Sequence, residues 1–350
     1  MVYGNNKLKN RNDMLREDKM KKIKYVIPIL IVVLLTAPMV YGDGVKKIAQ
    51  TGMKWMSIPI GARASAMGGA FTALGGDPSV LFWNPGALGM IEGKSVFLSQ
   101  TRWIADIQVN GGAVSYNTGN WGVIGLSIAA VQWGDLHGTQ RASTSSGYIE
   151  TGTFSPTNWA AGIAYSLKVS EQFSFGGHLK YAHENLGSTL EGTMDNPREF
   201  TAEMDIVVFD FGTLYYTGFK DLRIGMTLQN FSQEKAYRVE SYPLPLTFKF
   251  GMAMDIMTVI QESDRHSLTL SVDAIHPRDF TERLHFGGEY NFQDILFLRG
   301  GYKTNHDEQN ISFGGGLKLN IQNMKVGLNY SMLNFSNFDS VHMFSFDFEF

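Results

Sequence analysis

The sequence predicts an all-β protein: a transmembrane antiparallel β-barrel of about fourteen strands, preceded by a small-residue helical hatch. Three observations carry this prediction. Apolar and polar residues alternate with a period of two from Lys94 to the C-terminus, the alternating stretches are long, and the connections between them alternate between short and long. The first observation predicts strands, and the other two favour a membrane barrel over a soluble β-sandwich.

The alternation puts apolar and aromatic residues on one face of each strand, with small and polar residues on the other. In residues 159–169, Trp159, Ile163 and Tyr165 share one face, and Ala160, Ala164 and Ser166 share the other. Residues 284–292, 311–321 and 342–350 repeat the pattern. These stretches run for about ten to thirteen residues, against about five or six in an average strand, which is the length that a tilted strand needs to cross a bilayer.

The breaks between strands also follow an order. Short turns are expected at 117–120, 170–171, 217–221, 293–294 and 320–323, and longer loops at 134–156, 185–202, 232–244, 276–282 and 334–340. Outer-membrane barrels have short turns on the periplasmic rim and long loops on the outer rim. The last strand ends in Phe346, Phe348 and Phe350, and a terminal aromatic strand is common in outer-membrane barrels, so we take these residues as a barrel C-terminal signal.

The N-terminus predicts export. An apolar run from Tyr25 to Tyr41 follows three lysines and ends in small residues, so residues 1–42 are expected to be an extension plus a signal peptide cleaved near Gly42. A membrane anchor is the alternative, but seventeen residues with two prolines are short for it. Met20 is an alternative start. Residues 43–93 would then be the hatch and residues 94–350 the outer-membrane barrel; a periplasmic arm outside the lumen is the alternative for residues 43–93.

Composition excludes several classes of function. The chain has no Cys, so disulfide scaffolds and cysteine-ligated metal sites are excluded. Residues 1–42 hold eight Lys/Arg and three Asp/Glu, so the mature chain has 22 bases, 30 acids and a net charge of −8. This charge gives no electrostatic basis for binding nucleic acid.

The sequence predicts neither catalysis nor a cofactor or metal site. Gly125-Leu126-Ser127 is the nearest approach to a nucleophile elbow, but it lies in the middle of a predicted strand. His178 and His183 are five apart on one strand and point to opposite faces, which argues against a shared metal. Glu289 and Asp347 are expected to be solvated side chains of the lumen.

Residues 43–93 do not alternate. The run from Ile60 to Ala73 consists mostly of small residues, which suits close packing inside a barrel too wide to be filled by its own side chains. Asp77 before Pro78 is expected to cap a short helix. Arg63, in an apolar stretch, is expected to pair with a carboxylate or carbonyls.

This segment also carries a family resemblance. It resembles the PorV/PorQ-like outer-membrane proteins, which belong to the wider FadL-like barrels. The motif residues and expected hatch residues are Gly61, Arg63, Met67, Gly68, Gly69, Asp77, Trp83, Asn84 and Pro85. Weaker similarity continues through 244–251, 273–277, 283–290, 298–302 and 342–346, so it spans the mature chain.

The resemblance implies a fourteen-stranded barrel with an N-terminal hatch in the outer membrane, surrounded by lipid. Two roles occur among such proteins, and a purely structural barrel is a third. PorV-like members serve type IX secretion, with a translocon and cargo proteins as partners. FadL-like members pass hydrophobic small molecules through the lumen. The alternation pattern does not choose between these roles.

Overall fold

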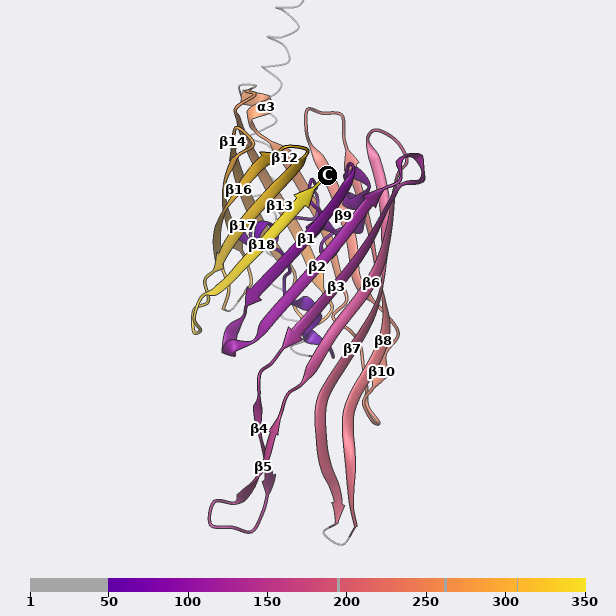
Figure 1. The fold of residues 1–350 in the computed structure, drawn as a ribbon, viewed down its shortest axis with the longest axis vertical. Coiled ribbons are helices and arrows are strands. Elements are labelled where there is room, and N and C mark those ends of the chain that lie inside the picture. Colours follow the sequence, from indigo (N-terminus) through magenta and orange to yellow (C-terminus); the bar gives the residue numbers. More distant parts are fainter. Residues whose placement is uncertain (1–49, 194–195, 261–262, 307) are drawn as a thin grey trace, which may run out of the picture. The chain divides into compact units, whose positions relative to one another are not determined.

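In the computed structural model, the chain closes into an antiparallel β-barrel (Figure 1). The structure describes residues 50–193, 196–260, 263–306 and 308–350, so the predicted signal peptide lies outside the described residues. Within the described part, fourteen strands close the barrel in the order β1-β18-β17-β16-β15-β14-β13-β12-β9-β8-β7-β6-β3-β2. The predicted fold class and strand number are therefore confirmed.

The barrel strands occur where the alternation predicts them. They are β1 Lys94–Arg102, β2 Gln108–Asn117, β3 Val123–Gln132, β6 Thr157–Lys168, β7 Phe173–Thr193, β8 Asn196–Tyr216, β9 Arg223–Phe231, β12 Thr247–Asp255, β13 His266–Pro277, β14 Arg283–Phe292, β15 Leu296–Lys303, β16 Ile311–Ile321, β17 Met324–Leu333 and β18 Val341–Glu349. The first and last strands pair directly, with Leu98 opposite Phe346. Two backbone hydrogen bonds between Lys94 and Phe350 complete this seam.

The two faces of the barrel wall differ as predicted. On the outward face, Ile163 is 51% exposed and Phe313 is 53% exposed, whereas the inward-facing Ala164 and Ser312 are each 1% exposed. Because a lipid-facing wall exposes apolar side chains, this pattern is that of a transmembrane barrel. Among the described residues, no helix is both long and apolar enough to cross a bilayer.

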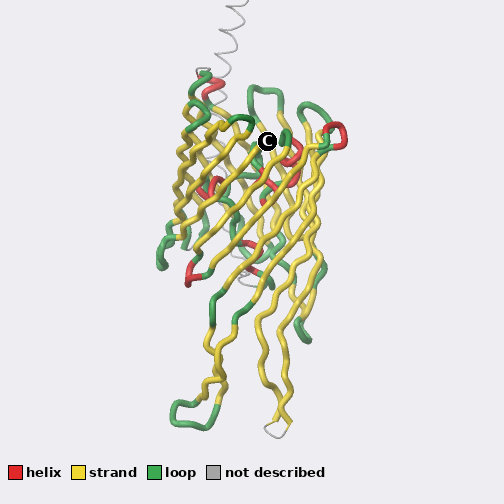
Figure 2. The backbone as a smooth tube through the Cα atoms, in the orientation of Figure 1, coloured by secondary structure: helices red, strands yellow, loops and turns green. Residues whose placement is uncertain are grey.

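The two longest predicted loops are largely strand. Residues 134–156 form a separate hairpin of β4 Leu136–Arg141 and β5 Tyr148–Phe154. The predicted loop 185–202 is the outer half of the β7–β8 hairpin, which shifts register between Asn185 and Ser188 and then continues to pair. Both predictions of loops were wrong because these stretches lack the apolar face that a lipid-facing strand requires. Figure 2 shows both hairpins as strands that extend past the other strands.

The remaining elements lie in connections at the rims. On the long-loop rim, η4 Ile104–Asp106 joins β1 to β2, and the short strands β10 Lys235–Ala236 and β11 Ser241–Tyr242 pair with each other. On the short-turn rim, η5 Gly119–Trp121 joins β2 to β3. The connection from β12 to β13 on that rim is longer than its neighbours and holds α3 Met257–Ile260.

The segment before β1 forms four short helices inside the barrel. These are η1 Lys54–Ser57, α2 Ala62–Ala66, η2 Pro78–Phe82 and η3 Pro85–Met90. Of the predicted hatch, residues 43–93, the part that holds these helices is 53–91, and the name hatch refers to this part from here on. Asp77 accepts a hydrogen bond from the backbone N–H of Ser79 and so caps η2, as predicted. Asn84 caps η3 in the same way. After α2, Gly68 and Gly69 adopt φ of 67° and 74°, which turns the chain back on itself at no steric cost.

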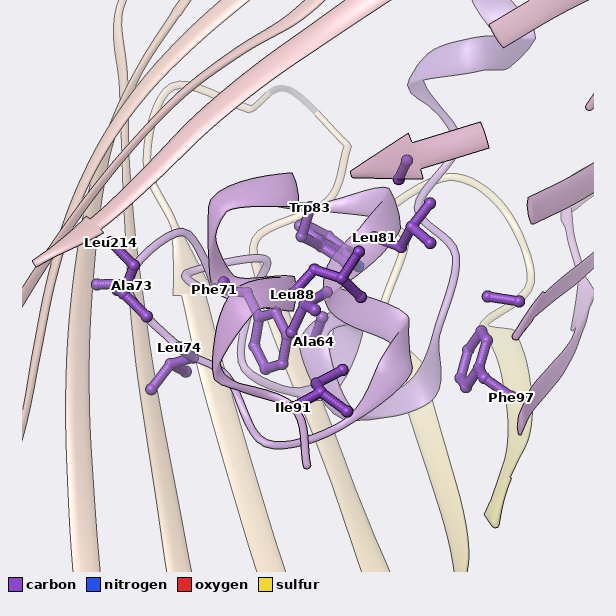
Figure 3. Close-up of a cluster of buried hydrophobic side chains, with 14 of the residues drawn as sticks. Ala64, Phe71, Ala73, Leu74, Leu81, Trp83, Leu88, Ile91, Phe97 and Leu214 are labelled. Atoms are coloured by element: carbon purple, nitrogen blue, oxygen red, sulfur yellow. The ribbon is translucent and has the colours of Figure 1, made fainter. Parts of the chain in front are cut away.

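A buried apolar cluster joins the hatch to the wall (Figure 3). Phe71, Leu81 and Leu88 of the hatch are at most 1% exposed, and they pack in one cluster with Phe97 of β1 and Leu214 of β8. Helices of four to six residues are unstable alone, so this burial holds them in place.

Candidate functional site

Arg63 fastens the hatch to the barrel wall. Its Nε and Nη2 donate hydrogen bonds of 2.8 and 2.7 Å to the two carboxylate oxygens of Glu289 on β14. Its Nη1 donates to Asp77 Oδ2 at 2.7 Å and to the carbonyl of Gly75 at 3.0 Å. Burial alone lowers the pKa of Arg63, but the carboxylates of Glu289 and Asp77 outweigh burial and hold the pKa above its usual value. The guanidinium is therefore charged and fully paired.

The polar network continues across the barrel wall. Arg299 of β15 donates to Glu289 at 2.6 Å and to Asn329 of β17 at 2.8 Å, and Asn329 donates to Asp347 of β18 at 2.8 Å. Glu289 is 6% exposed and Asp347 is 5% exposed. The prediction that these two carboxylates are solvated lining was wrong, because both are buried: Arg63 of the hatch pairs with Glu289, and Asn329 of the wall donates to Asp347.

A second carboxylate holds the turn after Gly69. Asp273 of β13 accepts three hydrogen bonds at its Oδ2: from the backbone N–H groups of Phe71 and Thr72 at 3.0 and 2.9 Å, and from the Thr72 hydroxyl at 2.6 Å. Asn84 donates to the carbonyl of the same Thr72 at 2.7 Å and to that of Thr213 on β8, three strands from β13, at 3.0 Å. These bonds fasten the Thr72 turn of the hatch to this part of the wall.

Glycines of the wall allow the hatch backbone to approach closely. A Cβ placed on Gly301 of β15 would overlap the backbone N of Gly68, and one on Gly225 of β9 would overlap the carbonyl O of Thr72. The neighbouring Gly300, on the outward face, has nothing within 4 Å. Backbone contact between hatch and wall therefore depends on inward-facing glycine.

Between the hatch and the long-loop rim lies a chamber, a cavity of about 620 Å³. Aromatic and aliphatic residues line it: Trp55, Ile58, Ile60, Trp103, Ile107, Trp133 and Phe280. Basic residues lie among them: Lys54, Lys180, Lys249, Arg283 and Lys303, together with His178, His285 and His306. Asp210 is the one acidic residue among the described residues that line it. The chamber is therefore both apolar and positively charged.

Several of these bases lack a carboxylate partner. Lys54 pairs with Asp279 at 2.6 Å and Lys180 with Asp210 at 2.7 Å. Among the described residues, however, neither Lys249 nor Lys303 forms an ion pair. Lys249 lies 4.9 Å from the ring centroid of Trp83, and Lys303 donates to the side-chain carbonyl of Gln309 at 2.8 Å. Unpaired ammonium groups facing a cavity favour an anionic ligand.

His306, in the β15–β16 connection, lies among the same positively charged groups. Its Nε2 is 3.1 Å from Nε2 of His285. Burial, with the smaller effects of the nearby charges of Lys303 and Arg283, lowers the pKa of His306 to about 3. His306 is therefore neutral near pH 7.

The structure brings most of the expected hatch residues into the lumen. Gly61, Met67, Trp83 and Pro85 lie in or beside the buried cluster, and Trp83 Nε1 donates to the carbonyl of Ile60 at 2.8 Å. The terminal residues Phe346 and Phe350 lie on the outward face and are 43% and 59% exposed, with Phe348 on the same face of β18.

Sequence reasoning noted two of the wall residues that receive the hatch, Glu289 as a lumen residue and Asp273 within the family resemblance, but not their hatch partners. Lys249 and Lys303 gave no signal beyond being polar residues in an alternating strand. Sequence reasoning also missed a cluster of three potential metal ligands on the outward face. There His183 Nδ1 lies 2.9 Å from Asp205 and 3.8 Å from Glu203. Only strand register brings these residues together.

The fold and the hatch define an outer-membrane β-barrel with an occupied lumen. Residues 148–348 match the family described as type IX secretion system membrane protein PorP/SprF, and residues 32–234 match the uncharacterised protein family UPF0164. Each match covers more than half of the chain, so the chain belongs to both families. No curated protein matches it in sequence.

Solved structures share the fold. The toluene transporter TbuX of Ralstonia pickettii matches with a TM-score of 0.56 and 15% identity, covering 83% of this chain and 98% of that one. The toluene transporter TodX of Pseudomonas putida gives 0.54 and 14%, covering 82% and 96%. A FadL homologue of Pseudomonas aeruginosa gives 0.50 and 14%, with the same coverage. At these identities the likeness establishes a FadL-like fold and nothing about substrate.

Proposed function

We propose that this protein is a PorV/PorQ-type component of type IX secretion, which handles exported proteins at the outer rim of the barrel. The observation that supports the secretion role is the match of residues 148–348 to the PorP/SprF family, which includes the long β7–β8 hairpin. The PorV/PorQ type rests on the resemblance of the hatch motif. The translocon and the exported cargo would be its partners, and the surrounding lipid its environment.

The interior argues that cargo does not pass through this barrel. The hatch is fixed to the wall by Arg63, Asp273 and Asn84, and the chamber above it measures about 620 Å³. A chamber of this size accommodates a small molecule rather than a protein chain in transit. In this proposal the hatch is a plug, and the exported protein meets the barrel from outside.

The long-loop rim offers a surface for such contact. The β4–β5 hairpin stands apart from the barrel sheet, and Tyr148, Ile149 and Phe154 on it are 47%, 45% and 39% exposed. Large apolar side chains on a segment beyond the lipid mark a site of protein contact. An unpaired strand edge adds backbone groups that an exported β-domain can bind.

Shortening this hairpin tests the proposal. Residues 136–154 are replaced by Asn-Gly, which allows a tight turn, and surface-exposed cargo is measured by protease shaving of whole cells. We expect cargo to accumulate in the periplasm while the amount of barrel in the outer membrane is unchanged. The matched control shortens the connection 256–265 on the opposite rim, which should leave secretion intact. Normal secretion by the hairpin variant would contradict the proposal.

The chamber favours a second function, FadL-like uptake of a small molecule. Its basic residues indicate an amphipathic anion with an aromatic or aliphatic body. A plain hydrocarbon carries no charge that could pair with the ammonium groups of Lys249 and Lys303. Calorimetry with an alkyl sulfate and with the corresponding alcohol tests this. We expect only the sulfate to bind, and to bind at least about tenfold more weakly to the Lys249→Met/Lys303→Met variant. Lys325→Met, on the short-turn rim, is the control. Equal binding of sulfate and alcohol would exclude an anion site.

A further inference from the structure

Strands β3, β7 and β8 place a serine, a histidine and an aspartate in one row on the inward face of the barrel. Ser127 Oγ lies 2.8 Å from His178 Nε2, and His178 Nδ1 lies 3.4 Å from Asp210 Oδ2. The order of contacts is that of a nucleophile, a general base and an orienting carboxylate. Two different ring nitrogens serve the two partners, as that chemistry requires.

The register of the sheet explains how the row forms. His178 and Asp210 are direct cross-strand partners, whereas β6 separates β3 from β7, and the residue of β6 opposite Ser127 is Gly162. A Cβ at Gly162 would overlap His178 Nε2. The glycine therefore opens the path by which the imidazole crosses β6 to reach the serine.

The aspartate is held in place from its other sides. Its Oδ1 accepts the backbone N–H of Asn230 at 2.7 Å, and its Oδ2 lies 2.7 Å from Lys180 Nζ. His178 Nδ1 makes no hydrogen bond to the described residues, because its 3.4 Å contact with Asp210 Oδ2 lacks hydrogen-bond geometry. A base–carboxylate contact of 3.4 Å is long, but such contacts commonly shorten when a substrate is bound.

The row is open to the chamber at its serine end. Ser127 lines the chamber and is partly exposed, whereas His178 behind it is 2% exposed. A reacting group in the chamber would therefore meet the Ser127 hydroxyl first, with the His178 ring, which also lines the chamber, directly behind it. The basic and aromatic walls fit a substrate with an apolar body and an anionic group.

We propose that Ser127, His178 and Asp210 form a hydrolytic site for carboxylic esters in the lumen. His178 Nε2 takes the hydroxyl proton as Ser127 Oγ bonds to the ester carbonyl carbon. The C–O bond to the alcohol then breaks, and the alcohol leaves with the proton from Nε2. Water then gives a proton to the same nitrogen as its oxygen bonds to the acyl carbon; the bond from that carbon to Ser127 Oγ breaks, and Oγ takes the proton back from Nε2 as the acid leaves. Lys180, two residues from His178 on the same face, pairs with Asp210 Oδ2 at 2.7 Å and so helps to keep this carboxylate ionised.

Covalent labelling tests the nucleophile. The folded full-length barrel in detergent is treated with a fluorophosphonate, and the modified residue is found by mass spectrometry. We expect label on Ser127, none on Ser127→Ala, and labelling slowed at least about 100-fold in His178→Gln. Ser99→Ala, which removes another inward-facing serine, should label like the parent. Label that persists in Ser127→Ala would overturn the proposal.

Ester turnover and the Gly162→Ala variant separate catalysis from a structural contact. With p-nitrophenyl butyrate we expect the parent to turn over and Ser127→Ala to lose activity. Gly162→Ala, which pushes the imidazole away, should lower kcat with KM little changed. Heat-modifiable gel mobility confirms that each variant is folded. Absence of either labelling or turnover in the folded parent overturns the proposal, as does full activity of Gly162→Ala.

Discussion

The guanidinium of Arg63 and the carboxylate of Glu289 meet through two parallel hydrogen bonds of 2.8 and 2.7 Å, although the residues lie 226 positions apart. This pairing joins the hatch to the wall on the side of β14. We expect Arg63→Met to destabilise the docked hatch by about 3 kcal/mol, because it leaves the buried carboxylate of Asp77 without its cation. The barrel should stay folded and show raised conductance in planar bilayers.

The control for this prediction is an exposed pair. Lys168 and Glu171 pair at 2.6 Å in the β6–β7 turn, and their side chains are 38% and 92% exposed. Lys168→Met should change stability by less than about 1 kcal/mol and leave conductance at the parent level. Deleting residues 61–88 sets the upper limit of conductance. A deletion variant that conducts no more than the parent would show that the hatch is not the plug.

Adjacent glycines of β15 provide a test of how closely the hatch fits the wall. Gly301 faces inward, where any side chain meets the backbone of Gly68, and Gly300 faces outward into open space. Gly301→Val should therefore displace the hatch and raise both conductance and protease cleavage within residues 61–88, whereas Gly300→Val should change neither. Equal behaviour of the two variants would contradict the close backbone contact.

The outward face carries a separate prediction. Phe313 on β16 is 53% exposed and faces lipid, so Phe313→Arg should cost about 2–4 kcal/mol if it lies near the bilayer midplane. Urea titration of the barrel in lipid vesicles measures this cost. Phe313→Leu is the control and should stay within about 1.5 kcal/mol of the parent. A loss no greater for arginine than for leucine would argue against lipid at this face.

The barrel could be predicted from sequence because the alternation that marks each strand arises within a short stretch of chain. Each strand has one face in lipid, so the alternation around Ile163 or Phe313 is visible in any short window. The helix caps at Asp77 and Asn84 are local too, since cap and first turn are neighbours in the chain. The outer half of the β7–β8 hairpin was missed because its strands stand outside the lipid and lose the apolar face on which the pattern depends.

The candidate sites could not be predicted, because they depend on register between strands. Ser127 and His178 lie 51 residues apart, and their contact requires that β6 present a glycine between them. In sequence, Ser127 was the nearest approach to a nucleophile elbow but was set aside because it lies in the middle of a strand. The partners of Arg63 were likewise unknown, although the need for a carboxylate followed from its apolar surroundings.

The pH dependence of stability tests the basic character of the chamber. The pKa of His306 is about 3 in the folded protein against 6.5 for the free side chain. Between these values the unfolded chain binds a proton that the folded protein does not, so the free energy of unfolding falls as the pH is lowered from about 6.5 toward 3.

His306→Gln keeps a polar side chain but cannot titrate, so we expect its stability to fall less over this range. Urea titrations at pH 7.5, 5.5 and 4 in lipid vesicles measure the slope. His276→Gln, on an exposed histidine beside Glu282, is the control and should keep the slope of the parent. If His306→Gln and the parent lose stability equally, His306 is already protonated in the folded chamber, and the neighbouring charges do not act on it as proposed.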